Sequence, residues 1–157
     1  MASICGMPRT EGLRSPYDKT TGGLHHLGRM LDKIRMRQAG RLPEDLRENY
    51  GLGLGLDGQL CGFLGVEFKD VEARVTQGGT DAEITEWIFA SGLRPSKMQA
   101  LIWNEHSRKL GWNDFVTKYL ARSKEAAGHG HRTDIVTSLD AIVLDEGHEP
   151  PRPRPAA

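Results

Sequence analysis

Arg35 and Asp32 are the first residues along the chain whose types and spacing could do chemistry. They stand three positions apart in Ser15 to Gly40, a segment with helical periodicity, so we expect them to lie one turn apart and to pair. Arg35 projects at the edge of the apolar arc of this helix, so its guanidinium should be half-buried. A guanidinium in that position can stabilise the fold, or it can bind a carboxylate or phosphate of a ligand. Both roles stay open at this point.

Glu105 is the second candidate, because its carboxylate interrupts an apolar helix face. Ser96 is the predicted cap of that helix, and Met98, Leu101 and Ile102 form its predicted core stripe. A carboxylate in the middle of such a stripe is either satisfied by an arginine or has a raised pKa and is available as an acid or base. We expect the arginine partner and keep the acid or base role as the alternative.

A glycine-rich loop is the one stretch that resembles a cofactor motif. Gly53, Gly55 and Gly58 spell G-x-G-x-x-G, but this fingerprint holds a pyrophosphate only where a strand precedes the loop and a helix follows it. A short helix precedes this loop and no strand is recognisable. We therefore interpret it as a flexible or tightly packed loop, with an anion held by its amides as the alternative.

Cysteine and histidine offer little further chemistry. Cys61 has neither a neighbouring base nor a helix N-terminus to form a thiolate, so we do not expect it to be a nucleophile. His129 and His131 form a His-x-His pair in a glycine-rich joint, but two ligands do not complete a metal site. We expect no metal and no cofactor.

Helices must position these residues, because every strongly periodic segment of the chain has helical spacing. In the helix that ends at Gly40, one arc carries the predicted core residues Leu24, Leu27, Met30, Leu31, Ile34 and Gln38. The opposite side carries a basic stripe, which we interpret as a solvent-exposed face, made of His26, Arg29, Lys33 and Arg37.

Capping residues and apolar residues at helical spacing predict the remaining helices. A short helix follows Pro43, another spans Phe68 to Thr76, and a capping box at Thr80 starts a third. Later helices should turn Phe115, Val116, Tyr119 and Leu120 inward, and Thr133 should cap the last one. The predicted fold is all-α, a compact single-domain bundle of about six to eight short helices.

The composition of the chain indicates how it divides into segments and which classes of partner are disfavoured. We expect a mobile N-terminal arm at residues 1–14, a single helical domain at 15–147 and a disordered proline-rich tail at 148–157. The 21 basic and 21 acidic side chains cancel, so we expect neither nucleic acid nor membrane as a partner. There is no apolar run of membrane-spanning length and no signal-peptide core, and two cysteines give no structural disulfide. These features favour a soluble, cytoplasmic protein.

An ordered series of short motifs resembles a known family. It includes S-P-Y-D-K-x-x-G-G-L at Ser15–Leu24, R-M-L-D-K-I-R at Arg29–Arg35, G-R-L-P-E-D-L at Gly40–Leu46, G-G-T-D-A-E-I at Gly78–Ile84 and G-W-N-D at Gly111–Asp114. The series is similar to a bacterial family defined as domain of unknown function 5069, and it covers nearly everything between Leu13 and Gly147. The resemblance implies a small, cytoplasmic, mostly helical protein and carries no activity with it.

The resemblance also singles out polar residues that spacing alone left unremarkable. As ligand-binding candidates it points to Asp18, Lys19, Lys33, Arg35 and Arg94. Asp32 and Glu105 are then the candidates for a catalytic acid or base. That these residues converge in one site is a hypothesis. The family has aromatic or aliphatic residues where this chain has His25 and His26, so the resemblance implies no metal site at these histidines.

Three functions compete on this basis. The first is a non-catalytic binding or interaction module, with a protein partner or a small anionic ligand. The second is a small cytoplasmic enzyme that acts on an anionic small molecule, with Asp32 or Glu105 as acid or base and arginine anchors. The third, nucleic-acid binding through the basic stripe, is disfavoured by the neutral net charge. A homo-oligomer is compatible with the sequence.

Overall fold

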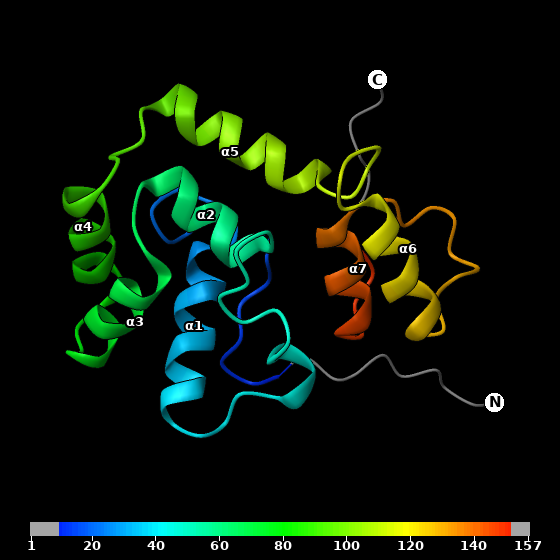
Figure 1. Cartoon of the computed structure of the whole chain (residues 1–157), viewed down its shortest axis with the longest axis horizontal. Coiled ribbons are helices and arrows are strands. Elements are labelled where there is room, and N and C mark those ends of the chain that lie inside the picture. Colours follow the sequence, from blue (N-terminus) through cyan, green and yellow to red (C-terminus); the bar gives the residue numbers. More distant parts are fainter. Residues whose placement is uncertain (1–9, 152–157) are drawn as a thin grey trace. The chain divides into compact units, whose positions relative to one another are not determined.

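The computed structural model describes residues 10–151, which form seven α-helices and one short 3-10 helix and contain no strand (Figure 1). The all-α fold is confirmed. Backbone contacts group the described residues into an N-terminal unit, Gly12–Asn104, and a C-terminal unit that starts at Glu105 and also includes residues 10 and 11. The single domain over 15–147 stays a prediction. Residues 1–9 of the predicted arm and 152–157 of the predicted tail lie outside the described residues.

The helix α1, Leu27–Gln38, is the centre of the N-terminal unit. Its predicted apolar arc is confirmed, since Leu24, Leu27, Met30, Leu31 and Ile34 are fully buried. Gln38 is exposed instead and donates to the carbonyl oxygen of Glu72. The predicted exposed basic stripe is wrong: His26, Arg29 and Lys33 are buried, and only Arg37 is exposed. Buried oxygen acceptors, described below, account for this burial.

Three further helices of the N-terminal unit complete its core. They are α2 (Leu56–Leu64), α3 (Phe68–Thr76) and α4 (Asp81–Ser91), and α3 contacts α1, α2 and α4 (Figure 1). The capping box of α4 is confirmed, with the Thr80 hydroxyl accepting from the amide of Glu83. The helices contribute to the core the buried residues Leu60, Leu64, Val71, Val75, Ile84 and Ile88. They enclose α1 and give its polar side chains fixed neighbours.

The glycine-rich loop between the short helix η1 (Glu44–Leu46) and α2 is tightly packed. Gly55 precedes α2 directly, and Gly58 already lies in its first turn. A Cβ atom on Gly58 would lie 2.3 Å from the carbonyl oxygen of Gly53. Gly58 therefore packs against the backbone of Gly53, and close packing explains the glycine at position 58, whereas a Cβ atom on Gly53 would meet no atom within 4 Å.

The helix α5, Lys97–Lys109, begins at the predicted cap, since the amide of Gln99 donates to the Ser96 hydroxyl. Its predicted core stripe is wrong, because Met98, Leu101 and Ile102 are 62%, 53% and 57% exposed. Trp103 faces inward instead. Its ring stacks on Phe63 at 5.5 Å, and its Nε1 donates to the carbonyl oxygen of His25 at 2.9 Å. Burying the large indole with a partner for its N–H determines the rotation of the helix.

The C-terminal unit contains the end of α5 together with α6 (Thr117–Ala126) and α7 (Ser138–Asp145). Leu120, Leu139 and Val143 are buried, whereas Phe115 and Tyr119 are about half exposed, contrary to prediction. The last helix starts later than predicted, and Thr137 caps it in place of Thr133 by accepting from the amide of Asp140. None of the described helices is both long enough and apolar enough to span a membrane.

Candidate functional site

Asp32 and Arg35 are brought together in an ion-pair network that also contains Arg14 and Asp81, here called the Arg14 network. The Arg14 guanidinium donates from Nε and Nη2 to the two carboxylate oxygens of Asp32, both at 2.9 Å, and from Nη1 to Asp81 at 2.8 Å. Arg35 pairs with Asp81 at 2.7 Å and approaches Asp32 at 3.9 Å. The predicted partial burial of Arg35 is confirmed, but its close partner is Asp81, which was not predicted, and the predicted partner Asp32 lies at the longer distance.

Two residues show why the Arg14 network lies where it does. Arg14 belongs to the segment predicted to be mobile, yet its neighbour Leu13 is buried against Met36 and Leu42. The network therefore joins the segment around Arg14 to α1 and α4. Asp32 accepts from three groups of Arg14, namely its backbone amide, Nε and Nη2. An acid or base role for Asp32 would compete with these bonds.

A second set of charges, here called the Asp57 cluster, lies deep between α1 and α2. Asp57, which is 1% exposed, accepts from His26 Nε2 at 2.6 Å, from Lys33 Nζ at 2.7 Å and from the amide of Gly51 at 2.9 Å. Lys33 lies on α1 and His26 is the N-cap residue of the same helix, so both bond to one carboxylate of α2. The buried Arg29 donates to the carbonyl oxygen of Arg14. Three of the four residues of the predicted basic stripe, His26, Arg29 and Lys33, are thus bonded to oxygen acceptors inside the unit.

The electrostatics of the Asp57 cluster follow from this geometry. Burial by itself would raise the pKa of Asp57, but the hydrogen bond from His26 and the charge of Lys33 hold it well below its usual range. Burial lowers the pKa of His26 from 6.5 to about 4, although Asp57 opposes the shift. Burial also lowers the pKa of Lys33 from its usual value. These groups are almost completely buried, and their mutual bonds join α1 to α2.

The other predicted site residues have separate partners. Arg94 forms a surface ion pair with Glu86, and Asp18 accepts from the amide of Thr20 in its own turn. Lys19 is exposed. The structure thus brings together Asp32 and Arg35 and places Lys33 in the Asp57 cluster, whereas Asp18 and Arg94 contact other residues. A shared site for the whole set stays a prediction.

Glu105 lies in the C-terminal unit and has the cationic partner that we expected. Its carboxylate pairs with Arg108 at 3.1 Å and with Lys109 at 2.8 Å. The hydrogen bond from Lys109, with the charge of Arg108, lowers its pKa from the usual value. An ionised, paired carboxylate is a poor proton donor at neutral pH.

Cys61 and the first histidine of the His-x-His pair lie in different surroundings. Cys61 is a buried free cysteine, and burial raises the pKa of its thiol to about 12. His129 lies 3.5 Å from Asp145. Within residues 10–151 no three His, Cys, Asp or Glu side chains are arranged to hold a metal ion.

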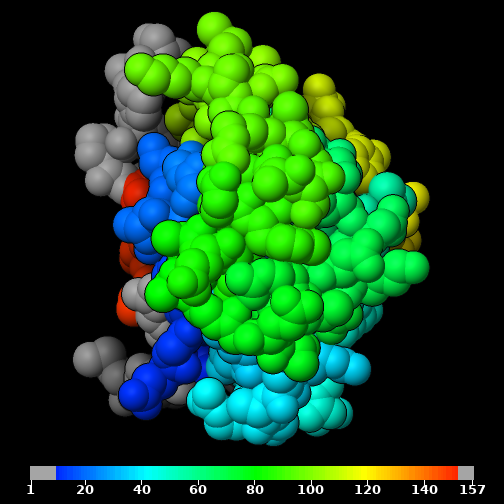
Figure 2. Space-filling model, turned by 90° about the vertical axis from the view of Figure 1, so that its left-hand side faces the viewer, coloured from blue at the N-terminus to red at the C-terminus, as the bar shows by residue number. Residues whose placement is uncertain are grey.

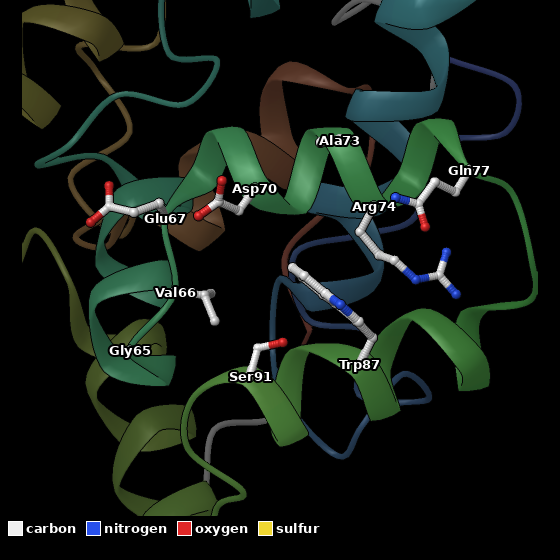
Figure 3. A pocket seen from close by; sticks show the side chains of 9 residues that line it. All are labelled: Gly65, Val66, Glu67, Asp70, Ala73, Arg74, Gln77, Trp87 and Ser91. Carbon is white, nitrogen blue, oxygen red and sulfur yellow. The ribbon is translucent and has the colours of Figure 1, made fainter.

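A cleft of about 330 Å³ lies between α3 and α4, within the N-terminal unit. Its α3 side consists of residues that recur at helical spacing along one face, including Glu67, Asp70, Ala73 and Arg74, and Trp87 and Ser91 of α4 form the opposite side. Trp87 projects from α4 toward α3, into the space between the two helices (Figure 3). The green atoms of this part of the chain cover the middle of the face drawn in Figure 2.

The two ends of the cleft differ in charge. Glu67 and Asp70 lie together at one end, and Arg74 and Gln77 lie at the other, with the indole of Trp87 between them (Figure 3). The carboxylates of Glu67 and Asp70 form no hydrogen bond or ion pair with any residue from 10 to 151. The Arg74 guanidinium donates to the carbonyl oxygen of Gly78 at 2.7 Å. The carboxylate end can therefore attract a cation, and the indole offers an apolar contact.

Sequence reasoning missed this cleft, although a signal was present. The helix Phe68–Thr76 buries Val71 and Val75, and its opposite face carries polar residues three or four positions apart. Such a face usually meets only water, so the pattern by itself does not indicate a site. Trp87 is half-buried and packs against the core of the N-terminal unit.

The comparisons with known proteins concern the family. No curated protein matches the chain. The model of one family, described as domain of unknown function (DUF5069), matches residues 10–148. This match spans the helices of both units, including the Arg14 network, the Asp57 cluster and the cleft. The chain therefore belongs to the DUF5069 family.

Proposed function

We propose that this protein is a non-catalytic binding module and that the cleft between α3 and α4 is its ligand site. One observation carries the proposal: a half-buried indole lines a cleft of about 330 Å³ together with two carboxylates that have no protein partner among residues 10–151. A cleft with an aromatic wall and a few polar groups is the usual form of a binding site. Unpartnered polar groups in it can bond to a ligand without breaking an existing contact.

The charged residues around α1 support a structural role for that region. Arg14 bonds to Asp32 and Asp81, and Lys33 bonds to Asp57. A ligand or substrate would have to displace one of these partners, which leaves a charge without its partner in a low-dielectric surrounding. The alternative of an enzyme that acts on an anionic small molecule needs Asp32 or Glu105 as a free acid or base. Both are ion-paired, so this alternative rests on the sequence alone.

We place the module in the cytoplasm. The buried free thiol of Cys61 is typical of proteins in a reducing compartment. The resemblance to a bacterial cytoplasmic family points the same way.

The proposal is tested with the full-length ¹⁵N-labelled protein and a library of small fragments that contains acids, bases and neutral aromatics in equal numbers. Binding at the cleft should produce saturable shifts of the Trp87 indole N–H and of the Ser91 amide. A Trp87→Leu variant should lose the shift at Ser91. The matched control is Trp112→Leu, because Trp112 is 61% exposed and does not line the cleft.

Two outcomes contradict the proposal. One is that no fragment of any charge shifts the signals of Trp87 and Ser91. The other is that bound fragments shift signals elsewhere and the Trp87→Leu variant binds them as well as the unsubstituted protein does.

A further inference from the structure

We infer that the α3–α4 cleft binds the guanidinium side chain of an arginine from a partner protein. The inference rests on the proposed function, in which this cleft is the ligand site, and it names the chemistry of the ligand. It concerns the carboxylate end of the cleft, which the sequence-based candidates do not include.

The two carboxylates at this end of the cleft favour a cationic ligand. Glu67 and Asp70 are one turn apart on the α3 side of the cleft, and neither carboxylate has a protein partner among residues 10–151. Two like charges one turn apart repel each other by a few tenths of a kcal/mol on a helix surface, so a cation between them also relieves this repulsion. An anionic ligand would increase it.

The indole adds a contact that a cation can use. Trp87 projects into the cleft between Asp70 and Arg74 (Figure 3). The face of an indole attracts cations, and among the aromatic side chains tryptophan does so most strongly. A guanidinium fits both features at once, because its flat face can stack on the ring while its edge donates to a carboxylate. An ammonium offers a point charge and no flat face, so we expect lysine to bind less well.

The shape of the cleft fits a side chain that enters from outside. Ala73 lies on the α3 side and leaves space that a longer side chain would fill. The volume of about 330 Å³ suits one long side chain and leaves no room for a folded segment. Glu67, Asp70, Ala73 and Ser91 are exposed, so the backbone that carries the arginine can remain outside the cleft.

The positive charge of Arg74 would repel a bound cation, but its position in the cleft limits this repulsion. It lies at the other end of the cleft, and its guanidinium is directed toward the turn after α3, where it donates to Gly78 at 2.7 Å (Figure 3). The three charged residues of the cleft, Glu67, Asp70 and Arg74, leave an excess of one negative charge. The field of the cleft therefore still favours a cation at the carboxylate end.

The experiment titrates the full-length protein with the N-acetyl amides of arginine, citrulline, lysine and glutamate and follows the Trp87 indole and Ser91 amide signals. Citrulline has nearly the shape of arginine but no charge. The arginine derivative should bind at least about 5-fold more tightly than the citrulline derivative. The glutamate derivative should give no saturable shift. The lysine derivative should bind more weakly than the arginine derivative.

Substitutions test whether the preference for arginine over citrulline depends on the two carboxylates. The double variant Glu67→Gln, Asp70→Asn should abolish the difference between arginine and citrulline. The matched control Glu44→Gln, Asp45→Asn makes the same change of charge at exposed residues that do not line the cleft, and it should keep the difference. An Ala73→Phe variant, whose ring would occupy the cleft, should weaken all ligands.

The outcomes separate this inference from the proposed function. If citrulline binds as tightly as arginine, or if an anionic or neutral fragment from the library binds best, the cleft is a ligand site but the inference is wrong. If no ligand at all shifts the two signals, the proposed function fails, and the inference fails with it. A preference for arginine that survives in the Gln/Asn double variant also overturns the inference.

Discussion

At the scale of single residues, Asp57 joins three separate parts of the N-terminal unit. One buried carboxylate accepts from an imidazole, an ammonium and a backbone amide, and these donors belong to α1, to its N-cap and to the loop before α2. Removing a charge from water costs several kcal/mol unless partners compensate it. The cluster is therefore compensated only as a whole, so the loss of one member leaves the others buried and unsatisfied.

We predict that Asp57→Asn lowers the free energy of unfolding by about 3–5 kcal/mol, since the Lys33 ammonium would stay buried without a counter-charge. Urea denaturation followed by circular dichroism measures this change. The control Asp45→Asn neutralises an exposed carboxylate of η1 and should change stability by less than about 0.5 kcal/mol. A loss of under about 1 kcal/mol for Asp57→Asn would mean that the cluster contributes little.

His26 should make stability depend on pH in a defined window. The pKa is about 4 in the folded protein and 6.5 for the ordinary side chain, so the unfolded chain binds more protons between these values. Stability is then fully present above pH 6.5 and is lost as the pH falls toward 4, by an amount on the order of 2–3 kcal/mol. The nearby charges are Asp57, Lys33 and Arg29, and Asp57 should remain ionised throughout this window.

The test compares the unfolding free energy at pH 7 and pH 4.5 in the unsubstituted protein and in His26→Asn. Asparagine does not titrate and tolerates the left-handed backbone of residue 26, whose φ is 73°. We expect the decrease between the two pH values to be smaller in the variant. Equal decreases in both proteins would contradict the assignment to His26.

At the scale of elements, sequence patterns predicted where helices begin better than they predicted which faces are buried. The capping boxes at Thr80 and Ser96 set helix starts through bonds between residues three apart, which a sequence displays directly. The buried face depends on neighbours that are distant in sequence. In α5, one inward indole outweighs the apolar stripe of Met98, Leu101 and Ile102, which is exposed.

The first turn of α2 offers a test of the packing argument for the glycine-rich loop. Gly58→Ala should destabilise the protein by more than about 1 kcal/mol, since the new Cβ would lie 2.3 Å from the Gly53 carbonyl oxygen. A Cβ atom on Gly62, in the same helix, would meet no atom within 4 Å, so Gly62→Ala should stabilise by about 0.5–1 kcal/mol. Thermal unfolding of both variants measures the contrast. Equal effects of the two substitutions would show that the loop is not tightly packed.

At the scale of the whole molecule, charge balance limits the kind of partner. The chain has 21 basic and 21 acidic side chains. Two cations of the predicted basic stripe, Arg29 and Lys33, are buried inside the N-terminal unit and cannot contact a partner. Polyanion binding needs several exposed cations on one surface, because its affinity comes from the release of counterions. The stripe as it exists on α1 leaves only Arg37 for this purpose.

We predict that the protein elutes from immobilised heparin at or below about 0.15 M salt at pH 7, with little dependence of retention on salt. A salt gradient on the purified full-length chain measures this. A basic protein of similar size serves as the retained control. Steep, salt-sensitive retention would contradict the prediction and restore nucleic-acid binding as a candidate function.

The sequence by itself determined the all-α class, the family, the capping box at Thr80, the cap at Ser96, most of the apolar arc of α1 and the arginine partner expected for Glu105. These features depend on spacing within one helix or on a pattern along the chain. Tertiary structure alone decided that Lys33 and Arg29 are buried, that Asp57 receives His26 and Lys33, and that α3 and α4 enclose a cleft beside Trp87. The physical reason is that burial of a charge depends on a compensating group from another element, and sequence spacing does not say which element will supply it.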